Sequence, residues 1–223
     1  MGLQQDLILP WWVPLFPLPN VVLLPRAILP LHIFEDRYRQ MTADALASDR
    51  LIAMALLKPG WEKSYHGRPP IEEVVCVGKI FQYERLDDGR YNLLLQGVGR
   101  ARLRELNDQL PYRRGHLEWI IESEVLEIDL ADQRQKLREL FDDHRIKNTD
   151  LTRQLRRLFD SPVTTPDLAD VLAFSLLTNL QDKQALLADA DVVHRVKKII
   201  DLLSRAYPAI PRDAQGLMKN ILN

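Results

Sequence analysis

The spacing of apolar and polar residues changes near residue 120, and this change divides the chain into two regions. Seven of the nine glycines lie between Gly60 and Gly115, where short apolar runs alternate with turn residues. No glycine lies between Gly115 and Gly216, and this stretch is rich in Leu, Ala, Asp, Arg and Lys. The pattern predicts strands and turns in the first region and helices in the second, with the boundary near residues 120–128.

The first region is predicted to form a sheet with one helix packed on it. The apolar runs VPLFPLP, VVLLP and LIAMALLK are typical of strands or extended segments. Between them, Tyr38, Met41, Thr42 and Ala45 recur at the spacing i, i+3, i+4, i+7. This spacing predicts a helix with one buried stripe.

The segment VVCVGKIFQYERLDDGRYNLLLQGVGRARLREL predicts a β-hairpin. Asp87, Asp88 and Gly89 separate its two strand-like runs, and Asp-Gly is a favoured turn pair because it tolerates positive φ. Gly97 and Gly99 interrupt the returning strand, which indicates a bulge or a close approach of two backbones. Together these signals favour a barrel-like, β-rich unit.

The second region predicts four or five helices. Thr165, followed by a proline, is expected to cap the third helix, and Asp191 is expected to cap the last. The last helix carries an apolar stripe at helical spacing, formed by Val192, Val196, Ile199 and Leu203. The predicted ranges are 129–143, 149–160, 166–179, 182–189 and 191–206.

An uncharged, largely apolar stretch between Asp6 and Arg26 is long enough to suggest a membrane span, but it contains five prolines. A helix interrupted so often could not satisfy its own backbone in lipid. The residues before this stretch lack the basic charge of a signal peptide. We therefore expect extended, core-bound polypeptide in a soluble protein, with Trp11 and Trp12 as core or lid side chains.

Composition narrows the function classes without naming one. The 223 residues carry a formal net charge of -1 and have a hydrophobic content of 46%. This balance weighs against a surface devoted to nucleic acid or to an anionic membrane. Cys76 is the single cysteine, so the chain cannot form an intramolecular disulfide, and a cytoplasmic location fits best.

The motifs of common catalytic sites are missing from the sequence. There is no GxxxxGK[ST] phosphate loop, no GxSxG elbow and no HExxH pair, and the five histidines are scattered. Cys76 lies in an apolar strand, where a thiol is normally buried and unreactive. We expect no catalytic residue, no cofactor and no metal, and therefore no enzymatic activity.

Two features are candidates for binding. The loop over residues 58–70 carries Trp61 and Tyr65, and loops with large aromatic side chains often carry function, although a lid packed on its own barrel is an equal alternative. Arg100, Arg102 and Arg104 alternate along a strand and are expected to project from one face. That face is either solvated or a groove for an acidic peptide or nucleic acid.

Three of these stretches resemble a known family. VPLFPLPNVVLLPRAILPLHIFEDRYRQM and VGKIFQYERLDDGRYNLLLQGVGRARL resemble the N-terminal substrate-binding domain of Lon-type ATP-dependent proteases. DLADVLAFSLLTNLQDKQALLADADVVHRVKKIIDLL resembles the helical subdomain that follows it there. The resemblance covers about residues 10–206, and the insertion LKPGWEKSYHGRPPI is similar to stand-alone bacterial members without ATPase or protease domains.

The resemblance implies an α+β fold: a PUA-like β pseudobarrel with a packed helix, followed by a C-terminal helical bundle. The expected division is residues 1–125 for the β-rich subdomain, 126–207 for the helical subdomain and 208–223 for a tail. The implied function is non-enzymatic binding of unfolded or damaged polypeptide in protein quality control. A full-length Lon protease is a candidate partner.

Apolar and aromatic side chains would carry that function. Trp61, Tyr65, Phe81 and Tyr83 are the candidates by residue type and location, because the family supplies no residue-level binding motif for these positions. Strand addition at an open barrel edge is a further way to hold a client.

Two alternatives from other classes remain open at this point. PUA-like folds include RNA readers, and the strand of Arg100, Arg102 and Arg104 would then contact phosphates, although the balanced charge weighs against it. The other alternative is a cryptic hydrolase, which degradation of casein with or without ATP would reveal.

Overall fold

The computed structural model of the protein describes residues 9–64, 67–107, 109–142, 146 and 149–208. These residues form two compact units. The first unit comprises the described residues of Met1–Ser123 together with Thr178–Ala190. The second comprises those of Glu124–Leu177 and Asp191–Asn223.

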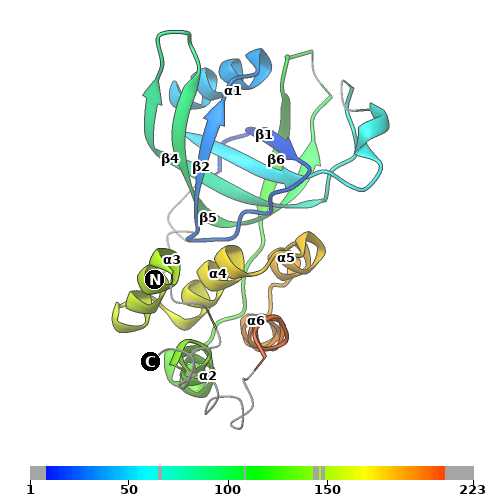
Figure 1. The fold of residues 1–223 in the computed structure, drawn as a ribbon. Coiled ribbons are helices and arrows are strands. Elements are labelled where there is room, and N and C mark those ends of the chain that lie inside the picture. Colours follow the sequence, from blue (N-terminus) through cyan, green and yellow to red (C-terminus); the bar gives the residue numbers. More distant parts are fainter. Residues whose placement is uncertain (1–8, 65–66, 108, 143–145, 147–148, 209–223) are drawn as a thin grey trace. The chain divides into compact units, whose positions relative to one another are not determined.

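The first unit is built on a six-stranded sheet with the order β2-β5-β4-β3-β1-β6, and β5 also pairs with β6 (Figure 1). β1 and β3 are parallel, and the other pairs are antiparallel. β3 is buried at every position, and its side chains join apolar residues of β1, β4, β5 and β6 in the core. The strands are β1 (Val13–Leu18), β2 (Ile28–Ile33), β3 (Leu51–Leu56), β4 (Val74–Arg85), β5 (Tyr91–Glu105) and β6 (Arg113–Trp119).

Two helices accompany this sheet. α1 (Asp36–Leu46) buries the predicted stripe of Tyr38, Met41, Thr42 and Ala45. Side-chain hydrogen bonds connect both ends of α1 to the rest of the first unit. Arg39 Nε donates to Gly89 O at 3.0 Å, and Asp44 Oδ2 accepts from Tyr112 Oη at 2.6 Å. α5 (Leu180–Ala188) contacts β4, where Gln184 Nε2 donates to Val74 O at 2.9 Å.

The predicted hairpin and its bulge are both present. The turn between β4 and β5 has Gly89 at φ +80°, in the region that glycine tolerates. The β4–β5 register shifts between Val77 and Gly78, opposite Gly99 and Gly97. At Gly97 two backbones meet, because Gly97 N donates to Ala27 O at 2.9 Å and Arg26 N donates to Gly97 O at 2.8 Å.

The second unit contains four of the five predicted helices, and two short 3-10 helices. α4 packs against α6 and α2, and α6 buries the predicted stripe. Asp191 caps α6 as predicted, accepting from His194 N at 2.9 Å. The helices are α2 (Ala131–Asp142), α3 (Asp150–Arg157), α4 (Thr165–Leu176) and α6 (Val192–Ala206), with the 3-10 helices η2 (Glu127–Leu130) and η3 (Leu158–Asp160).

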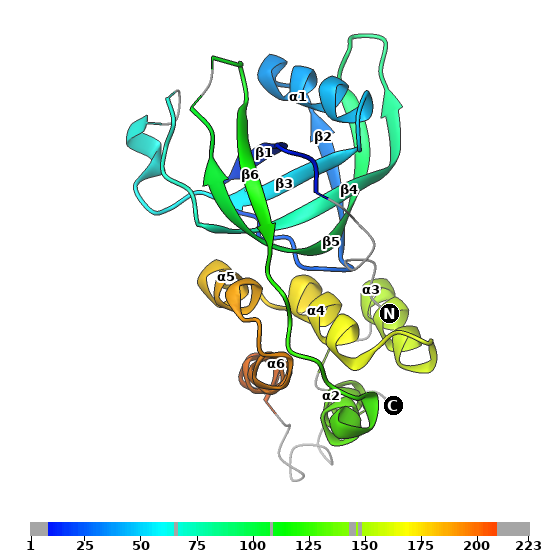
Figure 2. The ribbon, with the colours of Figure 1, turned by 180° about the vertical axis from the view of Figure 1, so that it is seen from behind.

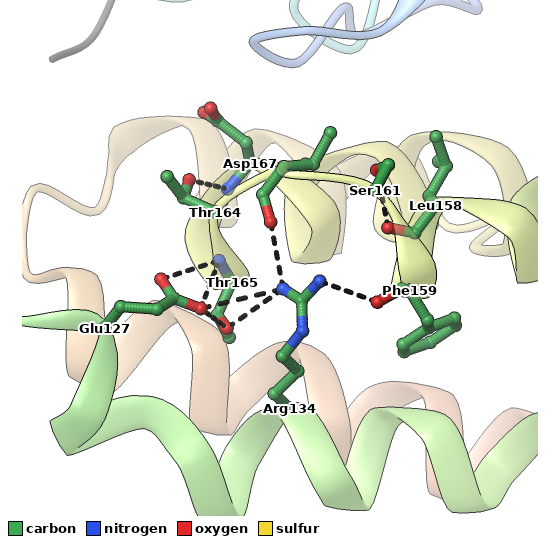
Figure 3. A network of polar contacts seen from close by, with 9 residues as sticks. Glu127, Arg134, Leu158, Phe159, Ser161, Thr164, Thr165 and Asp167 are labelled. Carbon is green, nitrogen blue, oxygen red and sulfur yellow. Dashed lines mark hydrogen bonds and ion pairs between the residues drawn. The ribbon is translucent and has the colours of Figure 1, made fainter.

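The cap of α4 differs from the prediction by one residue. Thr164, not Thr165, accepts from Asp167 N, and Thr165 begins the helix. Thr165 is buried, and the carboxylate of Glu127 satisfies its polar groups by accepting from both its backbone N–H (3.0 Å to either oxygen) and its hydroxyl (Figure 3). A carboxylate at this position also complements the dipole of the helix.

Arg134 of α2 completes this network. Its guanidinium donates to Phe159 O at 3.1 Å, to Val163 O at 3.0 Å and to Thr165 Oγ1 at 3.3 Å (Figure 3). One side chain thus satisfies two backbone carbonyls, one within η3 and one in the connection from η3 to α4.

Replacing Arg134 by alanine should lower the free energy of unfolding by about 1–3 kcal/mol, because two partly buried carbonyls lose their donor. Arg138 lies on the same helix, pairs with the exposed Asp160 and has its guanidinium carbon 5.3 Å from the centroid of the Phe159 ring, but it satisfies no carbonyl of the described residues, so Arg138→Ala should cost less than about 1 kcal/mol. Urea unfolding followed by circular dichroism at 222 nm measures the free energy of unfolding of both variants. Equal effects of the two substitutions would contradict this assignment.

The α+β class is confirmed, whereas the pseudobarrel and the C-terminal bundle stay predictions. The domain boundaries also stay predictions, and the observed units assign residues 178–190 to the sheet rather than to the helices around them in sequence. Residues 209–223 of the predicted tail lie outside the described residues. Trp11 is 75% exposed, so of its predicted roles as a core or lid side chain the core role is wrong. Among the described residues, no helix is long and apolar enough to cross a membrane.

Candidate polypeptide-binding surface

The outer part of the β4–β5 hairpin and β2 together form a three-stranded surface. Its register places Leu94 of β5 between Pro30 and Gln82, and His32 beside Asn92. A shallow cavity of about 490 Å³ lies over these strands. Its lining comprises Pro30, Leu31, His32, Gln82, Tyr83, Glu84, Asn92, Leu93 and Leu94. We call this set the hairpin surface.

Hydrogen bonds between side chains fix the polar part of the hairpin surface. Asn92 connects two strands, because its Oδ1 meets His32 Nδ1 at 2.7 Å and its Nδ2 donates to Glu84 Oε2 at 3.2 Å. Arg90 contacts His32 Nε2 at 3.2 Å and donates to Asp88. The backbone N–H and guanidinium of Arg90 lower the pKa of Asp88 below its ordinary value. The polar groups are therefore held in place, while apolar side chains beside them stay exposed.

Exposed aromatic side chains flank the hairpin surface. Phe81 and Tyr83 of β4 are 47% and 46% exposed, and Tyr83 also lines the cavity. Phe34, 62% exposed, stacks on His32 with ring centroids 6.2 Å apart. Phe34 and His32 were not among the predicted binding residues. Along β2 His32 alternates in exposure with its neighbours, which a strand assignment would have predicted, whereas Phe34 follows the end of the strand.

Trp61 does not join this surface. It begins the 3-10 helix η1 (Trp61–Ser64), which lies at the other side of the sheet from the β4–β5 hairpin in both views (Figure 1 and Figure 2). Tyr65 lies outside the described residues. The four predicted aromatic candidates therefore include one neighbouring pair on β4 and one separate side chain, and their role in binding stays a prediction.

A clamp of charged side chains ties the 58–70 loop to the sheet. Arg68 and Arg113 both donate to the carboxylate of Glu105, and Arg113 also donates to Pro69 O at 2.7 Å. Burial alone would raise the pKa of Glu105, but the hydrogen bonds from Arg113 and Arg68 outweigh burial and lower it. The carboxylate is therefore charged at neutral pH, and the clamp holds the loop beside a second cavity of about 310 Å³.

The expected face of three arginines is not present. Arg102 and Arg104 are exposed, but Arg100 is 1% exposed. The chain that follows β6 covers it, because Ile120 N donates to Arg100 O at 2.9 Å and Glu122 Oε1 accepts from Arg100 Nη1 at 2.7 Å. Arg100 therefore cannot contact phosphates, and the RNA alternative loses one of its three contacts.

Groups suited to metal binding do not gather in the part of the chain that the structure describes, where no three His, Cys, Asp or Glu side chains could hold one ion. Cys76 is fully buried, as predicted. The hairpin surface is thus the described region in which exposed aromatic side chains, a cavity and oriented polar groups coincide.

Residues 12–205 match the family described as the ATP-dependent protease La (LON) substrate-binding domain. The chain belongs to this family. The match begins just before β1 and ends in the last turn of α6, so residues of both units lie within the Lon substrate-binding domain. The RNA alternative has no support in this assignment.

Curated relatives of this Lon domain are proteases several times its length. A Lon protease from Trichlorobacter lovleyi is 27% identical over 95% of this chain and 26% of its own length. One from Desulfosudis oleivorans is 25% identical over 86% of this chain and 23% of its own length. The chain thus spans about a quarter of the length of the curated relatives it matches.

Solved structures of Lon N-terminal domains share the fold. The N-terminal domain of Mycobacterium avium complex Lon protease has a TM-score of 0.64 and 22% identity, covering 86% of this chain and 98% of that one. A Lon N-terminal domain protein from Xanthomonas campestris has a TM-score of 0.61 and 21% identity, with 85% and 97% coverage.

Proposed function

We propose that this protein is a non-enzymatic module that binds exposed segments of unfolded or damaged polypeptide. Membership of the Lon substrate-binding domain family carries the proposal, since it assigns substrate recognition to this fold. The hairpin surface supplies a chemical basis, because unfolded chains expose the apolar side chains that folded ones bury. Clients would bury these side chains against Phe81 and Tyr83.

The exposed aromatic side chains suit this function better than a deep pocket would. Phe81 and Tyr83 are about half exposed, and contact with a client would remove that area from water at about 25 cal/mol per Å². A shallow surface accepts many sequences, because it does not require one shape. The module would therefore bind clients weakly and broadly, in cytoplasmic protein quality control and in association with a Lon protease.

The proposal predicts the outcome of a substitution on β4. A variant with Phe81→Ser and Tyr83→Ser should bind a labelled, chemically unfolded protein about tenfold more weakly, because the two aromatic anchors are lost. Leu151→Ser is the matched control, since Leu151 is 47% exposed, as Phe81 is, but lies on α3 in the second unit. Fluorescence anisotropy measures the three affinities.

Two results would contradict the proposal at different levels. If the native protein binds no member of a broad array of unfolded proteins and hydrophobic peptides, the function is wrong. If it binds them and the double variant binds equally well, the assignment of binding to the hairpin surface is wrong. Trp61→Ala then tests the second aromatic candidate.

A further inference from the structure

Beside the hairpin surface, the sheet of the first unit has two strand edges that no described strand covers. β2 pairs only with β5, so its other edge is open. β4 pairs with β3 through Lys79, and Ile80 N still donates to Arg50 O at 2.8 Å. Beyond Ile80, none of the described strands pairs with the outer edge of β4. Open edges can accept an added strand.

The backbone of β4 directs unused hydrogen-bonding groups outward at Tyr83 and Arg85. Neighbouring residues of an antiparallel strand direct their N–H and C=O groups alternately to the two sides. Leu86 N donates to Arg90 O at 2.9 Å, which fixes that alternation at the end of the hairpin. From Leu86, every second residue towards Ile80 directs its backbone N–H and C=O groups to the same side. Those of Glu84 and Gln82 therefore face β5, whereas those of Arg85 and Tyr83 face the open edge. All three residues Tyr83–Arg85 are exposed.

The open edge of β2 is protected by a proline. Gly97 N donates to Ala27 O, so the backbone groups of Ala27 face β5. By the same alternation, those of Leu29 and Leu31 also face β5. Pro30 therefore faces outward, where it offers no N–H to a new strand. A proline at such a position is a known protection of edge strands. The edge of β4 carries no proline between Ile80 and Arg85.

We propose that client segments bind by adding a strand to the edge of β4 at Tyr83–Arg85, a mode that rests on the proposed function. The ligand class is an extended polypeptide segment that is free of proline. Cross-strand pairing favours an aromatic or β-branched residue opposite Tyr83 and an acidic residue two positions away, opposite Arg85. Backbone bonds supply affinity for any sequence, and these two positions supply preference.

The bulge on β4 limits the length of the added strand. The register with β5 shifts between Ile80 and Gln82, so the regular part of the open edge begins at Gln82 and ends at the turn. An added strand can therefore pair with only about four residues. Such a short ladder gives weak, reversible binding, which suits a module that releases its clients.

A backbone donor can be removed from this edge without changing the ladder to β5. Because the N–H of Arg85 faces outward, Arg85→Pro should fold, whereas Arg85→Ala keeps the N–H and loses the same side chain. The probe is a labelled eight-residue peptide of threonine and valine with one glutamate. Arg85→Ala should bind it within about threefold of the native protein, and Arg85→Pro at least about tenfold more weakly than Arg85→Ala. The same peptide with its central amides methylated should bind the native protein at least about tenfold more weakly.

The possible outcomes distinguish the binding mode from the function. If the native protein binds the peptide and Arg85→Pro and Arg85→Ala bind it equally well, strand addition at the edge of β4 is overturned. The proposed binding of polypeptide would not be affected by this result. No binding of any unfolded protein or peptide would overturn both. A native dimer that Arg85→Pro converts to monomers would show that the edge pairs two copies, which also overturns the proposal.

Amide hydrogen exchange tests the same edge if Arg85→Pro does not fold. Saturating peptide should slow the exchange of the Tyr83 and Arg85 amides in the native protein. The amide of Asp88, at the tip of the hairpin, should not change. Unchanged exchange at Tyr83 and Arg85 overturns the proposal.

Discussion

Replacing Asp170 by alanine should lower the free energy of unfolding of the helical unit by about 3–5 kcal/mol. Asp170 of α4 and Arg195 of α6 are each 1% exposed, and Arg195 Nε lies 3.5 Å from Asp170 Oδ1. Without the carboxylate, the guanidinium would stay buried in a low-dielectric interior without its ionic partner. Removing one member of a buried ion pair is costly for this reason, whatever the net contribution of the intact pair.

Two controls separate this effect from the loss of any ion pair. Asp201 and Arg205 form an exposed pair on α6, so Asp201→Ala should cost less than about 1 kcal/mol. A double variant with leucine at positions 170 and 195 should recover most of the lost stability, because no charge is then buried.

Urea unfolding followed at 222 nm reports on the helices in which the pair lies. All four tryptophans belong to the first unit, so their fluorescence provides a separate signal for the sheet. If Asp170→Ala costs no more than Asp201→Ala, the buried pair behaves like a surface pair and its assigned role is wrong.

The elements that the sequence predicted well are those determined by neighbouring residues. The stripe of α1, the turn at Gly89 and the cap at Asp191 each depend on spacing or conformation within a few positions. The observed boundaries of the five α-helices in the second region also follow the predicted ranges closely. Local patterns are sufficient here, because the physical cause is itself local.

Contacts between distant parts of the chain could not be predicted in this way. The parallel pairing of β1 with β3 is one example, and the assignment of α5 to the sheet unit is another. Arg100 and Arg195 illustrate the same limit, since alternation and helical spacing describe where a side chain points but not what covers it. Glu122 and Asp170 are the partners that make their burial possible, and no local pattern identifies them.

The candidate surface shows both sides of this division. Phe81 and Tyr83 could be selected from the sequence as aromatic residues on a predicted strand. Their open edge could not, because it depends on where the pairing with β3 ends. The protection of β2 by Pro30 likewise has meaning only once the register with β5 is known.

Replacing Gly97 by valine should destabilise the sheet unit by about 3 kcal/mol and weaken polypeptide binding. A Cβ atom at Gly97 would overlap Leu24 O and lie 3.0 Å from Leu24 C, so it would meet backbone rather than a side chain that can rotate away. The backbone before β2 would have to move. That movement would break the hydrogen bonds from Gly97 N to Ala27 O and from Arg26 N to Gly97 O.

Gly60→Ala is the control for the general cost of replacing a glycine. Gly60 has φ +88°, and apart from its chain neighbours no atom of the described residues lies within 4 Å of the position that a Cβ would take, so its replacement should cost only about 1 kcal/mol of backbone strain. Tryptophan fluorescence during urea unfolding measures both variants, and anisotropy with the valine-threonine peptide measures binding. Because Gly97 holds β2 beside the hairpin, its variant should lose binding under conditions in which it is still folded. A Gly97→Val protein as stable as the native one would show that the two backbones can separate without cost, and the close approach would then have no structural role.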